Sequence, residues 1–178
     1  MKTTEILIAG FGGQGILFSG KFLAYKGLLE DLQVSWLPSY GPEMRGGTAN
    51  CNVILSDTPV GSPIVTSPDV LIAMNLPSLE KYVNTVVAGG QIYVDSSLID
   101  AKVERDDVEV FYIPATQMAK EEGIATLANM IIVGHLLEKH PELSFEGVAE
   151  VVEKLVPPKK AALKELNLKA LNLGKNYQ

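Results

Sequence analysis

"EILIAGFGGQGILFSGKFLAYKGLLED" (residues 5–31) is the stretch that decides the fold class of this chain. Its beginning, EILIAG (5–10), is a short apolar, β-branched run that ends in glycines, which is typical of a buried strand. Residues 15–31 then place apolar or small side chains along one helical face. Two positions of that face are Gly20 and Gly27, and glycine lowers helix stability. We therefore expect this helix to pack very close to the sheet or to another helix.

The same alternation of strand and helix continues along the chain. Further strands are predicted at 33–37, 49–56, 69–75, 90–95 and 108–114, and helices at 77–87, 115–122, 126–140, 145–155 and 159–173. This pattern is typical of an α/β fold, a three-layer α/β/α sandwich on a Rossmann-like, mostly parallel sheet. The link 38–48 is too short for a crossover helix, so at least one strand should run antiparallel. The helix at 126–140 is apolar over much of its circumference, which predicts burial or an interface.

The length of the chain, and the lack of any linker-like segment other than Pro157-Pro158, favour a single domain over residues 1–178. Pro157 and Pro158 break the chain before a C-terminal helical tail at 159–178, which carries five lysines and one glutamate. The whole chain has a formal net charge of −6, which argues against nucleic acid as the main partner. The basic tail could dock on its own chain or on a partner, although a solvated helix face is the simpler interpretation.

Cysteine content and hydropathy limit the classes of protein further. Cys51 is the only cysteine, so the chain cannot form an intrachain disulfide, hold an iron–sulfur cluster or build a structural zinc site from thiolates. No zinc motif, Walker loop or serine-centred elbow is found, and no metal site is expected. A signal peptide or membrane-spanning run is not evident, so we expect a cytoplasmic protein without a membrane partner.

The glycine loop GFGGQG (10–15) fits the G-x-G-x-x-G pattern and lies between a predicted strand and helix, as in a dinucleotide-binding site. The acidic residue that would bind the ribose is missing, because the end of the next strand reads SWLPSY (35–40). NAD or NADP binding is therefore the weaker interpretation. The loop is otherwise a tight turn with close helix packing, or a cradle for another ligand. Gln14, at its tip, is placed to reach a ligand or a partner chain.

A second loop, SYGPEMRGGTAN (39–50), has no apolar period and combines glycines and prolines with Glu43 and Arg45. From the residues alone it is a surface loop with an exposed ion pair, which stabilises by only about 0–1 kcal/mol. An arginine held in a shaped loop can also bind a carboxylate or phosphate through two parallel hydrogen bonds.

Taken together, GFGGQG (10–15), SYGPEMRGG (39–47) and ATLANMIIVG (125–134) resemble the gamma subunit of 2-oxoacid:ferredoxin oxidoreductases. This is the pyruvate/ketoisovalerate oxidoreductase catalytic domain family, and the resemblance runs over nearly the whole chain. PEMRGGTAN (42–50) looks most like the subunits of the 2-oxoglutarate and branched-chain ketoacid enzymes. The resemblance implies a complex that oxidatively decarboxylates a 2-oxoacid such as 2-oxoglutarate, forms an acyl-CoA and reduces ferredoxin.

The resemblance also implies a division of labour between chains. Such a complex uses thiamine diphosphate, magnesium, iron–sulfur clusters and coenzyme A, and this chain carries neither the cysteines nor the Gly-Asp-Gly motif of the cofactor-bearing chains. The implied partners are alpha, beta and ferredoxin-like subunits, with ferredoxin as acceptor and coenzyme A as a candidate ligand. We expect the isolated chain to be inactive and assign no cofactor to it, with coenzyme A left open as a ligand. An exposed partner face would allow the isolated chain to form a homodimer.

On the basis of the resemblance, we expect the two loops to form an interface or ligand site at the carboxyl ends of the strands. Its candidate residues are Gly12, Gly13, Gln14, Gly15, Tyr40, Glu43, Arg45, Gly46, Gly47 and Asn129. Asn129 lies in an apolar helix, where its amide either bonds a neighbouring loop such as 10–15 or is satisfied within the core. No catalytic residue is expected in the chain by itself.

Other polar residues have simpler interpretations. Asn75 and Asp95 end predicted strands and are more often helix or turn caps than ligands. His135 has no Cys or acidic partner at metal spacing, and His140, before Pro141, is expected to be a C-terminal helix cap. Cys51 is expected to be a small buried hydrophobe. Two alternatives stay open for the whole chain. One is a free-standing NAD(P)-binding Rossmann-type oxidoreductase, and the other is a scaffold subunit whose loops touch no ligand.

Overall fold

The fold is known from a computed structural model, which describes residues 3–39 and 48–178. One sheet of six strands forms the centre, in the order β2-β3-β1-β4-β5-β6. The strands are β1 (Thr4–Phe11), β2 (Gln33–Ser39), β3 (Thr48–Ser56), β4 (Val70–Ala73), β5 (Gln91–Asp95) and β6 (Glu109–Ile113). Among these strands only β3 runs against the others. The prediction of a mostly parallel sheet with an antiparallel strand is confirmed.

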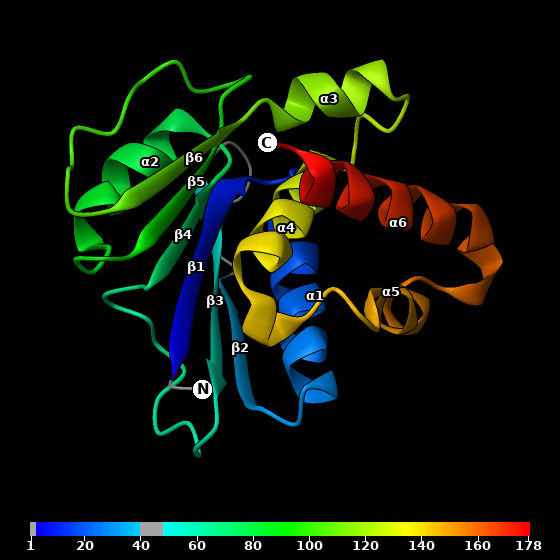
Figure 1. The fold of residues 1–178 in the computed structure, drawn as a ribbon, viewed down its shortest axis with the longest axis horizontal. Coiled ribbons are helices and arrows are strands. Elements are labelled where there is room, and N and C mark those ends of the chain that lie inside the picture. The colour runs from blue at the N-terminus through cyan, green and yellow to red at the C-terminus, as the bar shows by residue number, and fades with distance from the viewer. Residues whose placement is uncertain (1–2, 40–47) are drawn as a thin grey trace.

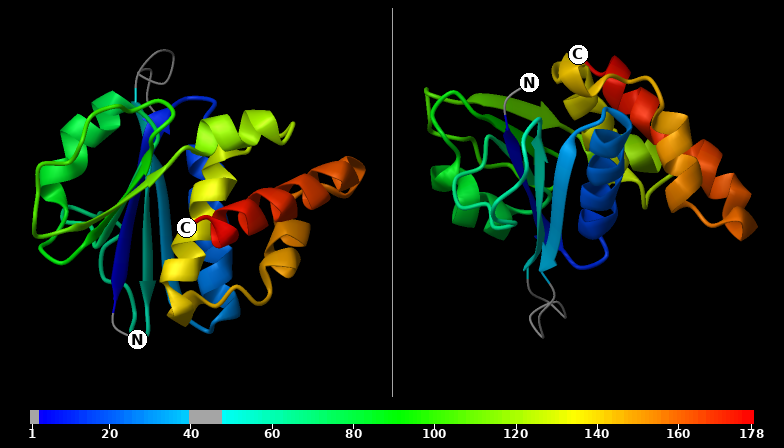
Figure 2. Two further views of the ribbon diagram at one scale, coloured as in Figure 1. Left: turned by 45° about the horizontal axis from the view of Figure 1, so that its top comes forward. Right: turned by 90° about the horizontal axis from the view of Figure 1, so that it is seen from below.

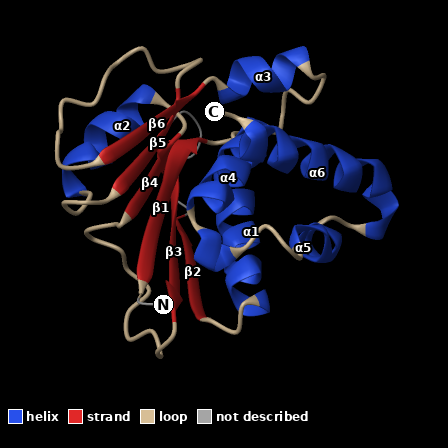
Figure 3. Ribbon diagram, in the orientation of Figure 1, coloured by secondary structure: helices blue, strands red, loops and turns tan. Residues whose placement is uncertain are grey.

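Helices cover both faces of this sheet, although unequally. They are α1 (Ile16–Leu29), α2 (Leu76–Tyr82), α3 (Ala115–Glu121), α4 (Ala128–Lys139), α5 (Val148–Leu155) and α6 (Ala161–Asn176), with 3-10 turns at Val83–Thr85, Pro141–Leu143 and Pro158–Lys160. In Figure 1, α2 lies on one side of the strands and α1, α4, α5 and α6 lie on the other. Figures 2 and 3 show the same separation. The α/β/α architecture is confirmed, and α6 adds an outer layer beyond α4.

The crossing of α1 over β2 and β3 depends on its two glycines. A Cβ atom added at Gly20 would collide with the sulfur of Cys51, and one at Gly27 would lie 2.6 Å from Leu55 Cδ2. The helix therefore accepts the instability of glycine in exchange for close contact with the sheet. This confirms the close packing expected from the sequence.

Helix α4 is enclosed between the sheet and α6. All residues from Ala128 to Leu137 are buried, as the apolar circumference of this segment predicts. Gly134 and Gly174 let the two backbones touch, because a Cβ at Gly134 would overlap the main-chain oxygen of Leu171, and one at Gly174 would overlap that of Ile131. The tail that contains α6 is therefore part of the core.

The lysines of this tail mostly contact their own chain. Lys164 Nζ lies 3.0 Å from Glu153, and Lys169 Nζ lies 2.7 Å from Glu122. Lys175 lies over the ring of Phe145, 4.5 Å from its centroid. The basic tail is therefore docked on its own chain, which was one of the possibilities considered from the sequence. No helix within residues 3–39 and 48–178 combines the length and apolarity needed to cross a membrane.

Candidate interface and ligand site at the carboxyl edge of the sheet

The glycine loop is a tight turn between β1 and α1. The Gln14 N–H donates to the Phe11 carbonyl at 3.2 Å, and Gly13, the third residue of the turn, has φ of 91°. This is the arrangement of a type II turn, which requires glycine at that position. Gly15 (φ 75°) follows as the N-cap of α1 and has no side chain to bond the first turn. No side chain therefore caps the first N–H groups of α1.

Gln14 is held within its own chain. Its Oε1 accepts the Phe11 N–H at 2.6 Å, and its Nε2 donates to the Met74 carbonyl at 2.9 Å. The side chain thus links the ends of β1 and β4, the two strands from which α1 and α2 depart to opposite faces. Open α/β sheets bind their ligands in the crevice at such a switch point. Here the Gln14 amide occupies that position, so in this conformation it does not extend toward a ligand or partner.

The order of the strands also differs from that of a dinucleotide-binding fold. In that site the second strand lies beside the first and brings an acid to the ribose. In this structure β3 lies between β1 and β2. The described end of β2, Leu37 to Ser39, is displaced by one strand and carries no acid. The geometry therefore gives no support to the NAD interpretation.

Asn129 connects α4 to the glycine loop. Its Nδ2 donates to the Gly15 carbonyl at 3.1 Å and to Ser19 Oγ at 2.9 Å. Of the two alternatives considered for Asn129, the bond to the 10–15 loop is the one observed, and it joins residues 114 positions apart in the chain. The Asn129 Oδ1 is buried and has no hydrogen-bond partner among the described residues. The contact is tight, because a Cβ at Gly15 would lie 2.5 Å from Asn129 Nδ2.

The second predicted loop falls largely outside the described residues. Tyr40, Glu43, Arg45, Gly46 and Gly47 all belong to residues 40–47, so their predicted roles stay predictions. The strand register does place Thr48, at the start of β3, opposite Phe11 at the end of β1. The main chain that follows the second loop therefore begins beside the glycine loop.

Two clefts flank the glycine loop. One, of about 300 Å³, lies among Phe11, Leu17 and Ala49, and the other, of about 370 Å³, lies between the loop, α4 and α6. Three large apolar side chains at the carboxyl ends of strands face solvent: Phe11 after β1, Leu76 after β4 and Leu98 after β5 are 42%, 38% and 48% exposed. Exposed apolar side chains at one edge, beside hollows, are typical of a surface that meets another molecule.

Several polar residues near this edge act as structural caps. Asn75 Oδ1 accepts the Ser78 N–H at 2.9 Å and caps α2. The Asp95 carboxylate accepts hydrogen bonds from the main chain of Ser97 and from both the N–H and the hydroxyl of Thr116, which fixes α3 against β5. The cap interpretations of both residues are confirmed.

The cysteine and the buried histidine are also structural. Burial raises the pKa of the Cys51 thiol to about 12, so it is a small hydrophobe and no nucleophile. His135 packs edge-on against Tyr93, Phe111 and Tyr177, and burial lowers the pKa of its imidazole. Within the described residues, no three His, Cys, Asp or Glu side chains are placed to hold a metal ion.

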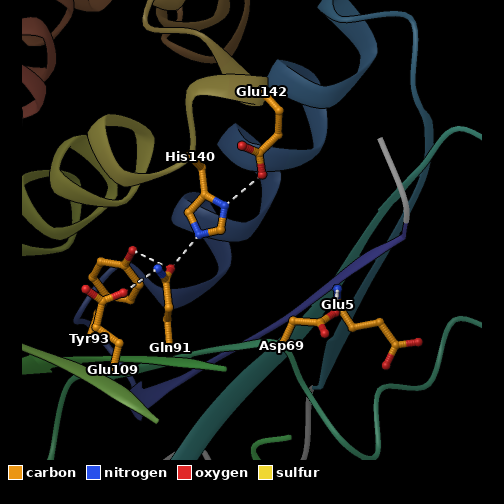
Figure 4. Close-up of polar contacts among 7 residues, drawn as sticks. All are labelled: Glu5, Asp69, Gln91, Tyr93, Glu109, His140 and Glu142. Carbon is orange, nitrogen blue, oxygen red and sulfur yellow. Dashed lines mark hydrogen bonds and ion pairs between the residues drawn. The ribbon is translucent and has the colours of Figure 1, made fainter. Parts of the chain in front are cut away.

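A polar network that the sequence did not indicate lies at the opposite, amino edge of the sheet (Figure 4). His140 contacts Glu142 Oε1 at 2.9 Å and Gln91 Oε1 at 2.7 Å, and Gln91 also bonds Tyr93 and Glu109. Burial, followed by the charge of nearby Asp69, raises the pKa of the Glu5 carboxyl on the same edge. The bond between His140 and Gln91 joins the end of α4 to the sheet, at the edge opposite to the glycine loop. Contacts of this kind join residues almost fifty positions apart, so no local pattern signals them.

Comparison with known proteins places the chain in a family. The family model described as pyruvate ferredoxin/flavodoxin oxidoreductase matches residues 5–177. The 2-oxoglutarate synthase subunit KorC of Methanothermobacter marburgensis is 37% identical over 178 residues, which cover 96% of this chain and 94% of that protein. The ketoisovalerate oxidoreductase subunit VorA of Methanothermobacter thermautotrophicus is 38% identical over 174 residues. There the match covers 97% of this chain but 36% of VorA, so this chain spans about a third of that relative.

Solved structures give the same result. The gamma subunit of a keto/oxoacid ferredoxin oxidoreductase from Geobacter sulfurreducens superposes with a TM-score of 0.82 and 30% identity, over 96% of this chain and 95% of that chain. The 2-oxoglutarate:ferredoxin oxidoreductase of Magnetococcus marinus, solved with 2-oxoglutarate, coenzyme A and succinyl-CoA bound, superposes with a TM-score of 0.86 and 28% identity. That match covers 98% of this chain and 31% of the other.

Proposed function

Because the chain belongs to the pyruvate ferredoxin/flavodoxin oxidoreductase family, we propose that it is the gamma subunit of a 2-oxoacid:ferredoxin oxidoreductase. It would act as one domain over residues 1–178 and complete the active site, or the coenzyme A site, at a subunit interface. The observation that carries the proposal is the end-to-end match with separate subunits, since the chain covers 94% of KorC and 95% of the Geobacter gamma subunit.

The carboxyl edge of the sheet is the surface that we assign to the partner subunits. It combines the glycine loop, the uncapped start of α1, two clefts, and the exposed side chains of Phe11, Leu76 and Leu98. Exposed apolar side chains are unfavourable in water and are stabilised when a partner covers them. The glycine loop is preformed by Gln14 and Asn129, so little conformational entropy is lost when it is bound.

The chemistry of the complex would be supplied by the other chains. We propose that thiamine diphosphate, magnesium and the iron–sulfur clusters belong to alpha, beta and ferredoxin-like subunits, and that ferredoxin is the acceptor. The described residues fit this division, because their single cysteine is buried and protonated. Coenzyme A at this edge is supported by its presence in the Magnetococcus enzyme. We place the complex in the cytoplasm and name 2-oxoglutarate or a branched-chain 2-oxoacid as its substrate.

The proposal is tested by a tagged pull-down from the native host with the wild-type chain and two variants. Recovery of thiamine-diphosphate and cluster-bearing chains in fixed ratio with the wild type is expected. Leu98→Lys places a charge on the carboxyl edge and should lower recovery of those chains about tenfold or more, because a buried unpaired charge is strongly unfavourable at an interface.

The matched control is Ile64→Lys, because Ile64 is 60% exposed and lies near Thr3 and Glu5 at the opposite edge. It should leave recovery unchanged. Recovery of the wild-type chain alone would contradict the subunit role, whereas equal loss in both variants would contradict the assignment of the interface.

A further inference from the structure

The sheet ends laterally at β2, which pairs with β3 on one side and has no strand on the other (Figure 1). The hydrogen bonds of the inner strands decide which main-chain groups of β2 are open. The carbonyls of Glu5 and Ala9 in β1 accept N–H groups immediately before and after β4. The odd-numbered residues of β1 therefore bond toward β4 and its even-numbered residues toward β3, because the N–H and C=O of a strand residue point to the same side.

This alternation carries across the register to β2. Residues of β3 opposite the even-numbered residues of β1 have odd numbers and bond to β1, so the even-numbered residues of β3 bond to β2. These lie opposite the odd-numbered residues of β2. Val34, Trp36 and Pro38 therefore direct their main-chain groups away from the sheet, where proline is tolerated because it has no N–H. The N–H and C=O groups of Val34 and Trp36 have no partner among the residues that the structure describes.

Helix α1 adds a side-chain flank to this open strand. Lys21 and Leu28 lie on the side of α1 opposite to Ser19, and Ser19 Oγ bonds α4. Lys21 Nζ lies 5.9 Å from the centroid of the Trp36 ring, which places the flank beside β2. Leu28 is 54% exposed. Open main-chain groups on an edge strand are a template for pairing with another strand, and here an exposed leucine lies next to them.

The open groups of β2 match those of a second β2. Two such strands that run antiparallel about a two-fold axis at Ser35 place Val34 of one copy opposite Trp36 of the other. Each of these pairs exchanges two hydrogen bonds, so the outward N–H and C=O groups of both residues are all satisfied. An axis at Trp36 would place Val34 opposite Pro38, which has no N–H to return a bond. An axis at Val34 would place Trp36 opposite Leu32, whose N–H is already bonded.

The charges on this edge are complementary in the same register. Asp31 and Lys21 are both exposed, and neither forms an ion pair with a described residue. Pairing about Ser35 brings Asp31 of one copy opposite residue 39 of the other, at the carboxyl end of β2. Lys21 extends toward that end, because helix side chains tilt toward the helix N-terminus and α1 begins at the carboxyl edge. A carboxylate thus meets an ammonium on each side of the axis, which favours the antiparallel orientation.

We propose that the chain forms a homodimer through β2, in which two sheets join into one about a two-fold axis at Ser35. Leu28 lies level with Val34, because a Cβ at Gly27 would be 3.1 Å from Val34 Cγ2, so Leu28 faces α1 of the second copy. The glycine loop and the carboxyl edge are outside this interface. The dimer can therefore fail while the assignment of the partner subunits stands, and the reverse also holds.

The test begins with sedimentation of the full wild-type chain at micromolar concentrations, where a monomer–dimer equilibrium is expected. Disulfide formation under mild oxidation then tests the register. Ser35→Cys places two thiols in a non-hydrogen-bonded pair with Cα atoms about 4.5 Å apart, so most of the dimer should cross-link. Leu37→Cys is the matched control on the same strand and face. Its two Cα atoms would be about 13 Å apart, too far for a disulfide, and Cys51 is buried.

A charge at the axis tests the equilibrium. Ser35→Lys should raise the dissociation constant of the dimer about tenfold or more, because two like charges would lie opposite each other, whereas Ser35→Thr should keep it. A wild-type chain that stays monomeric would overturn the proposal, and this measurement needs no variant. A dimer in which Ser35→Cys does not cross-link, or in which Leu37→Cys cross-links equally, would also overturn it. So would a monomeric chain whose Ser35→Lys variant loses the partner subunits in the pull-down, since β2 would then belong to another interface.

Discussion

At the scale of the residue, single polar side chains decide what the glycine loop can do. Gln14 and Asn129 each bond main-chain groups of that loop or its neighbouring strand, which fixes a turn that would otherwise be flexible. The Gln14 side chain is bonded to Phe11 and Met74 at the ends of two neighbouring strands. In this loop the G-x-G-x-x-G pattern is therefore held by contacts within the chain.

His135 makes the stability of the chain depend on pH. Its Nδ1 donates to the Gly174 carbonyl at 3.2 Å, and burial, the largest cause, lowers the pKa of its imidazole in the folded state. Because the unfolded chain takes up a proton near pH 6.5 and the folded chain resists it, the free energy of unfolding should fall as pH drops below about 6.5. The slope from this group is at most about 1.4 kcal/mol for each pH unit.

Urea unfolding at pH 7.5 and at pH 5.5 measures the effect, each at a fixed salt concentration. His135→Phe keeps a ring among Tyr93, Phe111 and Tyr177 but cannot titrate, so the difference between the two pH values should shrink. The variant loses one hydrogen bond at both pH values, so the comparison rests on the difference and not on absolute stability. An unchanged difference would show that other groups, including the exposed carboxylates around His140, cause the dependence.

At the scale of the element, α4 and α6 are joined by backbone contact. Gly134 and Gly174 remove the side chains that would separate the helices, so the C-terminal tail is packed as tightly as the interior. The sequence indicated α4 as a buried helix, but the partner that buries its outer face is 40 residues further along the chain.

Gly134→Ala is expected to destabilise the fold by at least about 3 kcal/mol, because the added methyl overlaps the Leu171 carbonyl and the backbone must move. Gly61→Ala is the matched control. A Cβ at Gly61 meets nothing within 4 Å, so this change should alter stability by less than about 1 kcal/mol. Thermal unfolding of both variants gives the comparison, and a Gly134→Ala protein as stable as Gly61→Ala would mean that α6 is not docked on α4.

At the scale of the whole molecule, the two edges of the sheet differ in what they carry. The amino edge has the polar network around His140 and Gln91, two clefts and the exposed side chain of Ile64. The carboxyl edge has two clefts, the glycine loop, the uncapped start of α1 and the exposed side chains of Phe11, Leu76 and Leu98. Clefts are therefore common to both edges, and the glycine loop with the uncapped helix start distinguishes the carboxyl edge.

The proposed division of labour predicts that the purified chain will not reduce a viologen dye when supplied with a 2-oxoacid and coenzyme A. The physical reason is that its described residues offer neither a reactive thiolate nor a metal site for electron transfer. The same assay on the complex recovered in the pull-down is the positive control. Dye reduction by the chain alone would place catalytic chemistry within it.

The sequence by itself determined the features that depend on local pattern. The strand and helix alternation, the antiparallel strand at the short link, the close packing at Gly20 and Gly27, and the buried character of α4 all follow from periodicity and residue size. The family followed from three motifs in fixed order. The boundaries were less well predicted, since the helix expected at 77–87 ends as a helix at Tyr82 and continues as a 3-10 turn.

Only the tertiary structure decided how distant residues are used. It inserted β3 between β1 and β2, turned Gln14 inward to Met74, linked Asn129 to Gly15, and brought Asn167 and Lys160 to the same cleft as the glycine loop. Even the nearest of these side-chain partners, Gln14 and Met74, are 60 residues apart, and a single sequence carries no periodic signal at such distances. Local pattern fixes which segments form and which faces are apolar, whereas the pairing of those faces depends on packing of the entire chain.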